Sequence, residues 1–245
     1  HVEVYKRCGR IPQDLPDTKG MEGYLGIGHT RWATHGAPSD ENAHPHTDCT
    51  GRIAVVHNGI IENHLALKAA LLARGHKFSS ETDTEIFAHL IADALAGGAK
   101  DLQAAVRAAL AQVEGTYAIA VVSEKRPLEI VAAKTASPLV VGYGKGESFL
   151  ASDVPAILEH TREVNYLEEG ELAVLTADGI AIQGRNGEPV ARKPRKIEWS
   201  AVAAEKDGHK HFMHKEIFEQ PRAVADTIRG RASLEQGDVT LDGVE

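Results

Sequence analysis

The sequence predicts an α+β protein whose sheets are mainly antiparallel. Apolar residues recur at helical spacing between about residues 65 and 113, whereas residues 116–183 alternate as a series of short strands. No regular alternation of strand and helix links these stretches, so a parallel sheet is not expected. Aromatic residues make up 5% of the chain, and a core of mainly Ala, Val, Ile and Leu suits stacked helices and sheets.

Composition excludes several classes of protein. The 245 residues are 42% hydrophobic and 25% charged, which is typical of a globular chain with one large core or two modest ones. A formal net charge of -8 argues against a nucleic-acid partner, because phosphate backbones attract basic surfaces. No apolar run reaches the roughly 18 residues of a membrane span, and no signal peptide is recognisable. We therefore expect a cytoplasmic protein without a membrane partner, in which Cys8 and Cys49 are free thiols.

The first quarter of the chain predicts strands separated by loops. Residues 1–6 and 24–28 alternate as strands do, and a polar loop with two prolines joins them over residues 10–23. A second loop, over residues 38–50, leads to a β-branched strand over residues 52–57.

Three helices are expected next, each with a recognisable end signal. The first has apolar residues over positions 65–72 and is closed by Gly75. The second, over residues 86–95, follows the stretch TDTE at residues 82–85, which fits a capping box. Asp101 begins the third helix.

Short strands and hairpin turns are expected in the second half. Asp178-Gly179 and Asn186-Gly187 indicate two of the turns, and a last helix is expected over residues 213–228. The expected strands span residues 117–122, 128–132, 139–142, 148–151, 163–167, 171–175 and 180–183, with a short helix at 154–159.

One stretch, GHTRWATHG at residues 28–36, is explained by neither helical nor strand periodicity. Arg31 offers a planar pair of N–H donors for a carboxylate, and Trp32 offers an aromatic face that could cover a small ligand. Thr34 and His35 add short donors and acceptors. The stretch predicts a binding site, and an exposed turn with a solvated arginine is the open alternative.

Two further stretches place polar groups at the end of an element. Asn58-Gly59 follows the strand at residues 52–57, and both a tight hairpin turn and a strand end before a helix are open there. In the second case the Asn58 amide and a backbone N–H are presented together and could bind an oxyanion. Asp83 falls in the first turn of the second helix, where the helix dipole keeps a carboxylate ionised to face an ammonium group.

Five motifs carry a family resemblance: HTRWATHG, NAHPH, VVHNGIIEN, ETDTE and KEIFEQP. In this order and spacing they resemble the glutaminase domain, a type 2 glutamine amidotransferase domain, of glucosamine-6-phosphate synthases, over about residues 2–222. The resemblance implies an amino-terminal-nucleophile hydrolase fold, with two stacked sheets between helical layers. It also implies that this chain lacks the first strand region of that fold, because no stretch matches the family's Cys-Gly-Ile-Val-Gly start.

The resemblance implies roles for the site residues in binding glutamine. Arg31 would hold the carboxylate of glutamine and Asp83 its ammonium group, with Thr34 and His35 lining the same pocket. Trp32 would gate the passage of ammonia.

The catalytic roles are likewise implied by the resemblance. The Asn58 side chain and the Gly59 N–H would form the oxyanion hole, and His44 would belong to a loop that closes over glutamine. The family needs no cofactor and no metal. Its nucleophile is an amino-terminal cysteine whose own α-amino group is the base, expected about forty residues ahead of His1, so that this chain by itself is expected to be inactive.

The implied whole enzyme transfers ammonia from glutamine to fructose 6-phosphate, which gives glucosamine 6-phosphate for hexosamine synthesis. Its partner would be a sugar-isomerase domain of the same polypeptide, in a homodimer. Residues 1–222 would form the glutaminase domain, and residues 223–245 would begin the linker.

Two other hypotheses stay open on the residues alone. One is a metal-dependent hydrolase or metal-binding module, because imidazole is a common zinc ligand, although no pair of histidines has the His-Glu-x-x-His spacing. The other is a non-catalytic amino-acid-binding domain built on the same pocket. The histidines of the metal hypothesis are His29, His35, His44, His46, His57 and His64.

Overall fold

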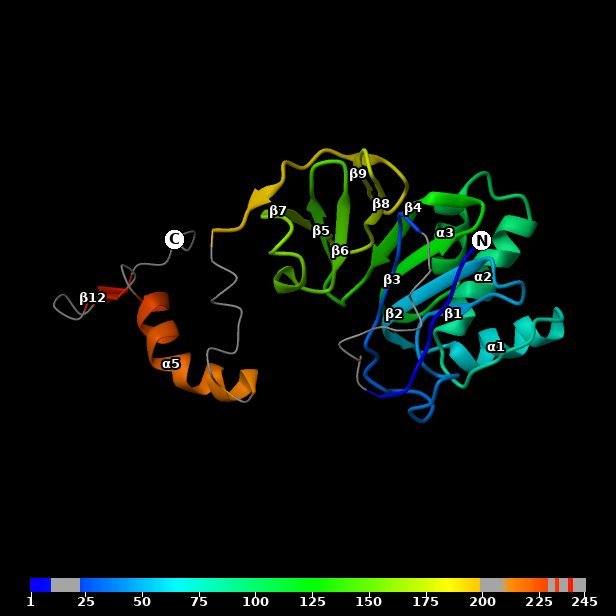
Figure 1. Ribbon diagram of the computed structural model, residues 1–245, viewed down its shortest axis with the longest axis horizontal. Helices are drawn as coiled ribbons and strands as arrows, with labels where there is room; N and C mark the ends of the chain where they lie inside the picture. The colour runs from blue at the N-terminus through cyan, green and yellow to red at the C-terminus, as the bar shows by residue number, and fades with distance from the viewer. Residues whose placement is uncertain (10–22, 199–208, 210, 229–231, 234–237, 240–245) are drawn as a thin grey trace. The chain divides into compact units, whose positions relative to one another are not determined.

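A seven-stranded antiparallel sheet, in the order β1-β2-β3-β4-β8-β9-β10, is the centre around which the first 197 residues are arranged (Figure 1). Its longest pairing joins β2 to β3 over their full lengths, from Ile53 opposite Ser123 to Ile61 opposite Gly115. The strands are β1 (His46–Thr47), β2 (Ile53–Ile61), β3 (Gly115–Ser123), β4 (Arg126–Lys134), β8 (Leu172–Thr176), β9 (Gly179–Gln183) and β10 (Pro189–Val190).

The computed structural model describes residues 1–9, 23–198, 209, 211–228, 232–233 and 238–239. The chain divides into two units, His1–Ile197 and Glu198–Glu245. Most of the expected polar loop at residues 10–23 lies outside the described residues. Within the described residues, no helix is both long and apolar enough to cross a membrane.

Three helices cover one face of the large sheet: α1 (His64–Ala73), α2 (Glu85–Ala96) and α3 (Leu102–Leu110) (Figure 1). The period-two alternation of β2 explains this packing, because Ile53 and Val55 point into the same apolar cluster as the buried face of α2. Phe87 and Leu90 of α2 are fully buried in that cluster.

A second antiparallel sheet packs on the opposite face of the first. Its order is β11-β7-β5-β6, and Ala54 and Val56 of β2 share an apolar cluster with Val141 of β5. The predicted α+β class with stacked antiparallel sheets is therefore confirmed. The strands of this sheet are β5 (Val140–Tyr143), β6 (Ser148–Ala151), β7 (Glu163–Tyr166) and β11 (Arg195–Lys196), and the short helix η2 (Val154–Ala156) follows β6.

The second unit contains α5 (Phe212–Ile228), which confirms the expected last helix, and the two-stranded sheet of β12 (Ala232–Ser233) and β13 (Asp238–Val239). Parts of the expected linker at residues 223–245 lie outside the described residues, and the domain boundary after residue 222 stays a prediction.

Two expected strands, residues 1–6 and 24–28, are wrong, because the structure places neither of them in a sheet. Their apolar residues have another explanation: Val2, Leu25 and Ile27 pack against the cluster between the two sheets as partly buried side chains. The alternation of apolar and polar residues in these segments therefore reflects burial of one side of the chain and not pairing with another strand.

The expected end of the strand at His57 is also wrong. Strand β2 continues through Asn58 and Gly59 to Ile61, so this dipeptide forms neither a hairpin turn nor a strand end. Gly59 keeps its place opposite Tyr117 with a φ of 138°, a conformation that glycine adopts without strain.

The capping box expected at the second helix does not form, whereas the cap of the third helix does. Thr84 is the N-cap of α2 without a side-chain cap bond, and Glu85 instead accepts hydrogen bonds from the backbone N–H groups of Ser79 (2.7 Å) and Ser80 (2.8 Å). Because α2 begins at Glu85, Asp83 lies before the helix and not in its first turn. In α3, Asp101 Oδ1 accepts from the Ala104 N–H at 2.7 Å, as predicted.

Candidate active site

A cavity of about 260 Å³ opens beside the middle of β2 and the start of α2. The eight residues predicted from the sequence all line it, although they come from four separate stretches of the chain. The lining residues are His29, Arg31, Trp32, Thr34, His35, His44, His57, Asn58, Gly59, Ile60, Thr82, Asp83, Thr84 and Thr116.

Gly59 brings the backbone of β2 unusually close to β3. A Cβ atom at this position would lie 2.0 Å from the Thr116 carbonyl oxygen and 2.9 Å from Nε2 of His57. No side chain larger than hydrogen fits there without moving the backbone. The glycine therefore allows Asn58 and the cavity wall to keep the strand register with β3.

His29 links the Asn58 side chain to the loop that carries Arg31. Nδ1 of His29 accepts from the Arg31 N–H at 2.9 Å, which leaves the ring proton on Nε2. Nε2 lies 2.7 Å from Asn58 Oδ1 and donates to it. The amide oxygen is thereby occupied, and the Asn58 NH₂ group is left as a donor.

Burial and the nearby Arg31 charge favour the neutral form of His29, which is the form whose Nδ1 can accept a hydrogen bond. Burial lowers the pKa of His29, and the nearby Arg31 charge lowers it further, while the bond to Asn58 opposes the change. His44 stacks on the ring, with the centroids 4.2 Å apart. Burial, reinforced by His29 and His46, lowers the pKa of His44 to about 2.

Arg31 organises its own loop. Its φ is 41°, in the left-handed region that non-glycine residues seldom occupy. The guanidinium donates to the carbonyl oxygens of His35 (2.6 Å), Gly36 (2.9 Å) and Ala37 (3.2 Å). Among the residues that the structure describes, these bonds use three of its five N–H donors, so two remain for a ligand.

Asp83 is a buried carboxylate, 4% exposed, on the wall of the cavity. Its Oδ2 accepts from the Ile61 N–H at 2.8 Å, which fixes the side chain to the end of β2. Among the residues that the structure describes, no cation pairs with it. A buried carboxylate without a counter-charge is costly, and a ligand cation would offset that cost.

The remaining predicted residues form the rim and back of the cavity. Trp32 is 91% exposed, as a residue at the mouth would be, and Thr34 follows it in the same loop. Nδ1 of His35 is buried and has no hydrogen-bond partner within the described part of the chain. His44 Nδ1 accepts from the His57 N–H at 3.3 Å.

Sequence reasoning did not assign roles to several lining residues. His57 Nδ1 lies 3.0 Å from the Thr84 hydroxyl, which ties β2 to the start of α2. Thr116 comes from the facing strand β3, more than thirty residues from the other lining residues, and no local pattern could have indicated it. For His57, Thr82 and Thr84, the available sequence signal was their position next to Asn58 or Asp83.

The histidines of the metal hypothesis contact one another mainly by ring packing. His44 meets His46 edge to face at 4.9 Å, and His35 meets His64 at 4.8 Å. None of the six belongs to the cluster of metal-type side chains that the described residues bring together, which consists of Cys49, His76 and His89. Within the described residues, these six histidines therefore do not converge into a group of three metal-type side chains.

Comparisons with known proteins agree with this geometry. A family model described as a glutamine amidotransferase domain matches residues 29–159, which include every residue predicted for the site. The chain is 53% identical over 243 residues to a glutamine–fructose-6-phosphate aminotransferase [isomerizing] of Thermus thermophilus; the match covers 98% of this chain and 39% of that protein. The chain thus spans about two fifths of the length of the curated relatives it matches.

Solved structures show the same fold. Glutamine phosphoribosylpyrophosphate amidotransferase from B. subtilis has a TM-score of 0.52 at 28% identity, covering 64% of this chain and 34% of its own. A structure described as the allosteric regulatory enzyme of purine biosynthesis has a TM-score of 0.51 at 27% identity, covering 70% of this chain and 35% of its own. The fold is that of amino-terminal-nucleophile glutamine amidotransferases. With more than half of its residues matched by the family model, this chain belongs to the glutamine amidotransferase domain family.

Proposed function

We propose that the chain is the glutaminase half of a longer enzyme, called here the whole polypeptide, and that its cavity binds glutamine. One observation carries the proposal: a buried carboxylate without a cation, Asp83, shares a cavity with the free donors of Arg31 and Asn58. An α-amino acid with a side-chain amide has the matching groups, namely an ammonium, a carboxylate and a carbonyl oxygen.

In this proposal, two charged residues bind the two charged groups of glutamine. The two remaining N–H donors of Arg31 bind the glutamine carboxylate, and Asp83 binds the ammonium group. Thr34 and His35 line the pocket around them, and Trp32, exposed at the mouth, gates the passage of ammonia. His44 belongs to the loop that covers the bound glutamine.

The proposed hydrolytic steps need a thiol nucleophile, and the described lining of the cavity contains no cysteine. Neither cysteine of the chain lines the cavity: the Cys8 N–H bonds to Asp40, and Cys49 contacts His76. We propose the amino-terminal cysteine of the whole polypeptide, whose thiolate adds to the amide carbon while its α-amino group carries the proton. This chain by itself is then inactive.

The tetrahedral intermediate places its oxyanion between the Asn58 NH₂ group and the Gly59 N–H. When the intermediate collapses, the carbon–nitrogen bond breaks, and the α-ammonium group returns its proton to the leaving ammonia. Water then hydrolyses the thioester to glutamate and regenerates the thiol. Bonds to the oxyanion strengthen in the transition state, so these donors act on the rate more than on binding.

The relatives are glutamine–fructose-6-phosphate aminotransferases, and we propose that the whole polypeptide likewise transfers this ammonia to fructose 6-phosphate. A sugar-isomerase domain of the same polypeptide would convert fructose 6-phosphate and ammonia to glucosamine 6-phosphate. The whole polypeptide would be a cytoplasmic homodimer. Residues 1–222 would be the glutaminase domain and residues 223–245 the start of the linker. No nucleic-acid, membrane or cofactor partner is proposed.

Labelling with the glutamine-directed electrophile diazo-oxo-norleucine tests the proposal. We expect mass spectrometry to find the label on the amino-terminal cysteine of the whole polypeptide and none on this chain. A label on Cys8 or Cys49 would overturn the mechanism. A whole polypeptide that binds glutamine without hydrolysing it would support a non-catalytic amino-acid-binding domain instead.

A further inference from the structure

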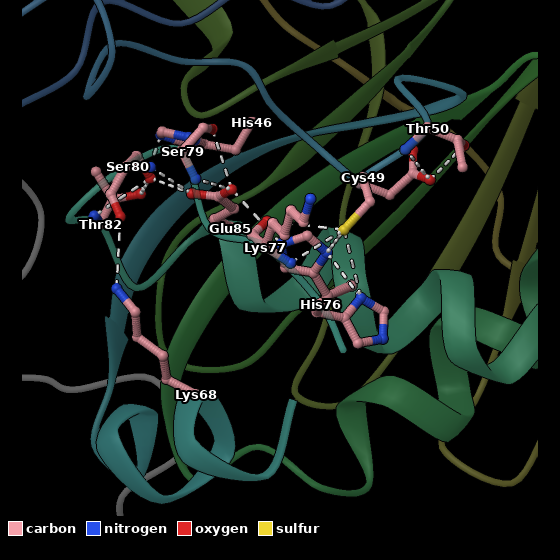
Figure 2. A network of polar contacts seen from close by, with 12 residues as sticks. His46, Cys49, Thr50, Lys68, His76, Lys77, Ser79, Ser80, Thr82 and Glu85 are labelled. Atoms are coloured by element: carbon pink, nitrogen blue, oxygen red, sulfur yellow. Dashed lines mark hydrogen bonds and ion pairs between the residues drawn. The ribbon is translucent and has the colours of Figure 1, made fainter. Parts of the chain in front are cut away.

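Three metal-type side chains meet away from the glutamine cavity. Cys49 follows β1, His76 lies between α1 and α2, and His89 is in the middle of α2. Figure 2 shows Cys49 and His76 pointing toward each other from these separate segments. The Cys49 sulfur lies 3.8 Å from Nδ1 of each histidine, and the two Nδ1 atoms are 3.2 Å apart.

A carboxylate stands behind each imidazole ring. His76 Nε2 lies 2.6 Å from Asp93 Oδ1, and His89 Nε2 lies 3.5 Å from Glu85 Oε1. Asp93 accepts a hydrogen bond from His76 Nε2, and the Glu85 charge favours a proton on His89 Nε2, which has no hydrogen-bond partner among the described residues. A proton on Nε2 leaves the lone pair of each ring on Nδ1. Both lone pairs then face the same point, where they repel each other unless a cation lies between them.

The spacing of the three atoms fits a tetrahedral zinc ion. Zinc–nitrogen bonds of about 2.05 Å and a zinc–sulfur bond of about 2.3 Å place two nitrogens about 3.3 Å apart and each nitrogen about 3.6 Å from the sulfur. The observed distances of 3.2 and 3.8 Å lie close to these values. The Lys77 backbone also holds the sulfur in place: its N–H donates to the sulfur at 3.3 Å, and its carbonyl oxygen lies 3.7 Å from the sulfur.

We propose that Cys49, His76 and His89 form a zinc-binding site with three protein ligands and a water in the fourth position. His89 is fully buried and Cys49 is exposed, so the ion enters and the water sits on the cysteine side. On binding, the Cys49 thiol releases its proton to solvent, and both imidazoles bind as neutral Nδ1 donors.

The site would fasten the loop after β1 to α2. Glu85, behind His89, also bonds to Ser79 and Ser80, and the Ser80 hydroxyl contacts Thr82 on the cavity wall at 3.1 Å (Figure 2). Zinc binding is therefore expected to raise the melting temperature of the chain. This site does not depend on the proposed glutaminase activity.

Metal titration of the chain tests the site directly. After removal of metal with a chelator, we expect one equivalent of Zn²⁺ to bind by calorimetry and to remain through gel filtration. Co²⁺ in its place should give a thiolate-to-cobalt charge-transfer band and the intense visible bands of four-coordinate cobalt. Cys49→Ser should abolish the charge-transfer band, whereas Cys8→Ser, at the other exposed cysteine, should leave binding and spectrum unchanged.

Two further measurements separate the ligands from the structural residues around them. Asp93→Asn removes the charge behind His76 and should weaken zinc binding by about tenfold to a hundredfold without changing the stoichiometry. In the unaltered chain, zinc should slow alkylation of Cys49 by iodoacetamide while Cys8, in the same molecule, reacts at its original rate. This second readout needs no variant and so does not depend on any substituted chain folding.

The competing structure of this cluster is a hydrogen-bonded one. There His89 is an imidazolium that donates to His76 and Glu85, and no metal is needed. Failure of the chain to bind zinc, or equal zinc binding by the unaltered chain and by Cys49→Ser, would overturn the proposal in favour of this cluster.

Discussion

At the scale of single residues, His29 connects the two parts of the proposed mechanism. One ring nitrogen accepts from the Arg31 backbone and the other donates to Asn58, so the carboxylate-binding loop and the oxyanion donor share one imidazole. In the proposed arrangement, Arg31 and Asp83 bind the two charged groups of glutamine, and His29 binds neither of them. It is a positioning residue, and its effect must pass through Asn58.

Replacing His29 by leucine frees the Asn58 amide to rotate. We expect kcat for glutamine hydrolysis by the whole polypeptide to fall by about tenfold to a hundredfold, with a smaller change in KM, because an oxyanion donor acts mostly in the transition state. Steady-state kinetics of the variant give both constants. His64→Gln is the matched control, since His64 packs on His35 but makes no hydrogen bond to Asn58. A rise in KM at constant kcat would contradict the positioning role.

Asp83→Asn removes the charge that we propose to face the ammonium group of glutamine. The asparagine side-chain oxygen can still accept from the Ile61 N–H, so the fold is expected to remain. KM for glutamine should rise about tenfold or more, the equivalent of losing roughly 1.4 kcal/mol of binding. Asp153→Asn, at the start of η2, is the control and should leave KM unchanged. A lower kcat at the original KM would assign the carboxylate a different role.

At the scale of elements, β2 supplies the cavity wall only because one residue in it lacks a side chain. Asn58 and Gly59 stay within the β2–β3 ladder, where a helix or turn was expected to begin. The close approach of Gly59 to the Thr116 carbonyl fixes both the ladder and the position of Asn58. The same close contact therefore sets both the pairing of β2 with β3 and the position of Asn58 in the cavity wall.

Gly59→Ala tests that constraint. The new Cβ atom would overlap the Thr116 carbonyl and would also need a φ of 138°, so we expect the free energy of unfolding to fall by at least about 2 kcal/mol. Gly179→Ala is the matched control, because Gly179 has a comparable φ of 148° but no atom within 4 Å of a new Cβ. Urea unfolding of both variants gives the comparison. Equal losses would mean that only the backbone angle matters.

At the scale of the whole molecule, buried neutral histidines make stability depend on pH. Burial, with the charge of Lys6, lowers the pKa of His46 to about 4, and burial lowers that of His44 to about 2. In the unfolded chain both return to about 6.5. Between the folded and unfolded values the unfolded state binds more protons, so acidification favours unfolding.

We therefore expect the free energy of unfolding to fall as the pH is lowered below about 6.5, by up to about 1.4 kcal/mol per pH unit for each of these histidines. Urea unfolding at about pH 7 and about pH 5.5 measures the loss before most carboxylates titrate. The interactions of Glu85 with His89 and Ser80 outweigh its burial and lower its pKa to about 2, so it adds a loss in the same direction only below about pH 4.5. His44→Gln should reduce the slope, and stability that rises on acidification would contradict the prediction.

Local signals in the sequence determined the elements whose ends depend on nearby residues. The helix closed by Gly75, the Asp101 N-cap and the Asp178-Gly179 hairpin turn all form as predicted, because each is set by backbone conformations and hydrogen bonds within a few residues. The same holds for the grouping of polar residues in the stretch at 28–36. All eight predicted site residues line one cavity, and their individual roles stay predictions.

Only the tertiary structure decided the features that depend on distant partners. Asn58-Gly59 is a turn signal in isolation, but pairing with β3 keeps it in a strand. Residues 24–28 alternate as a strand, but they meet the sheet through their side chains and not through a ladder. Cys49, His76 and His89 show no ligand spacing along the chain, because loop, connection and helix bring them together only after folding. Local propensity fixes conformation over a few residues, whereas pairing, burial and side-chain convergence are set by contacts between segments far apart in the sequence.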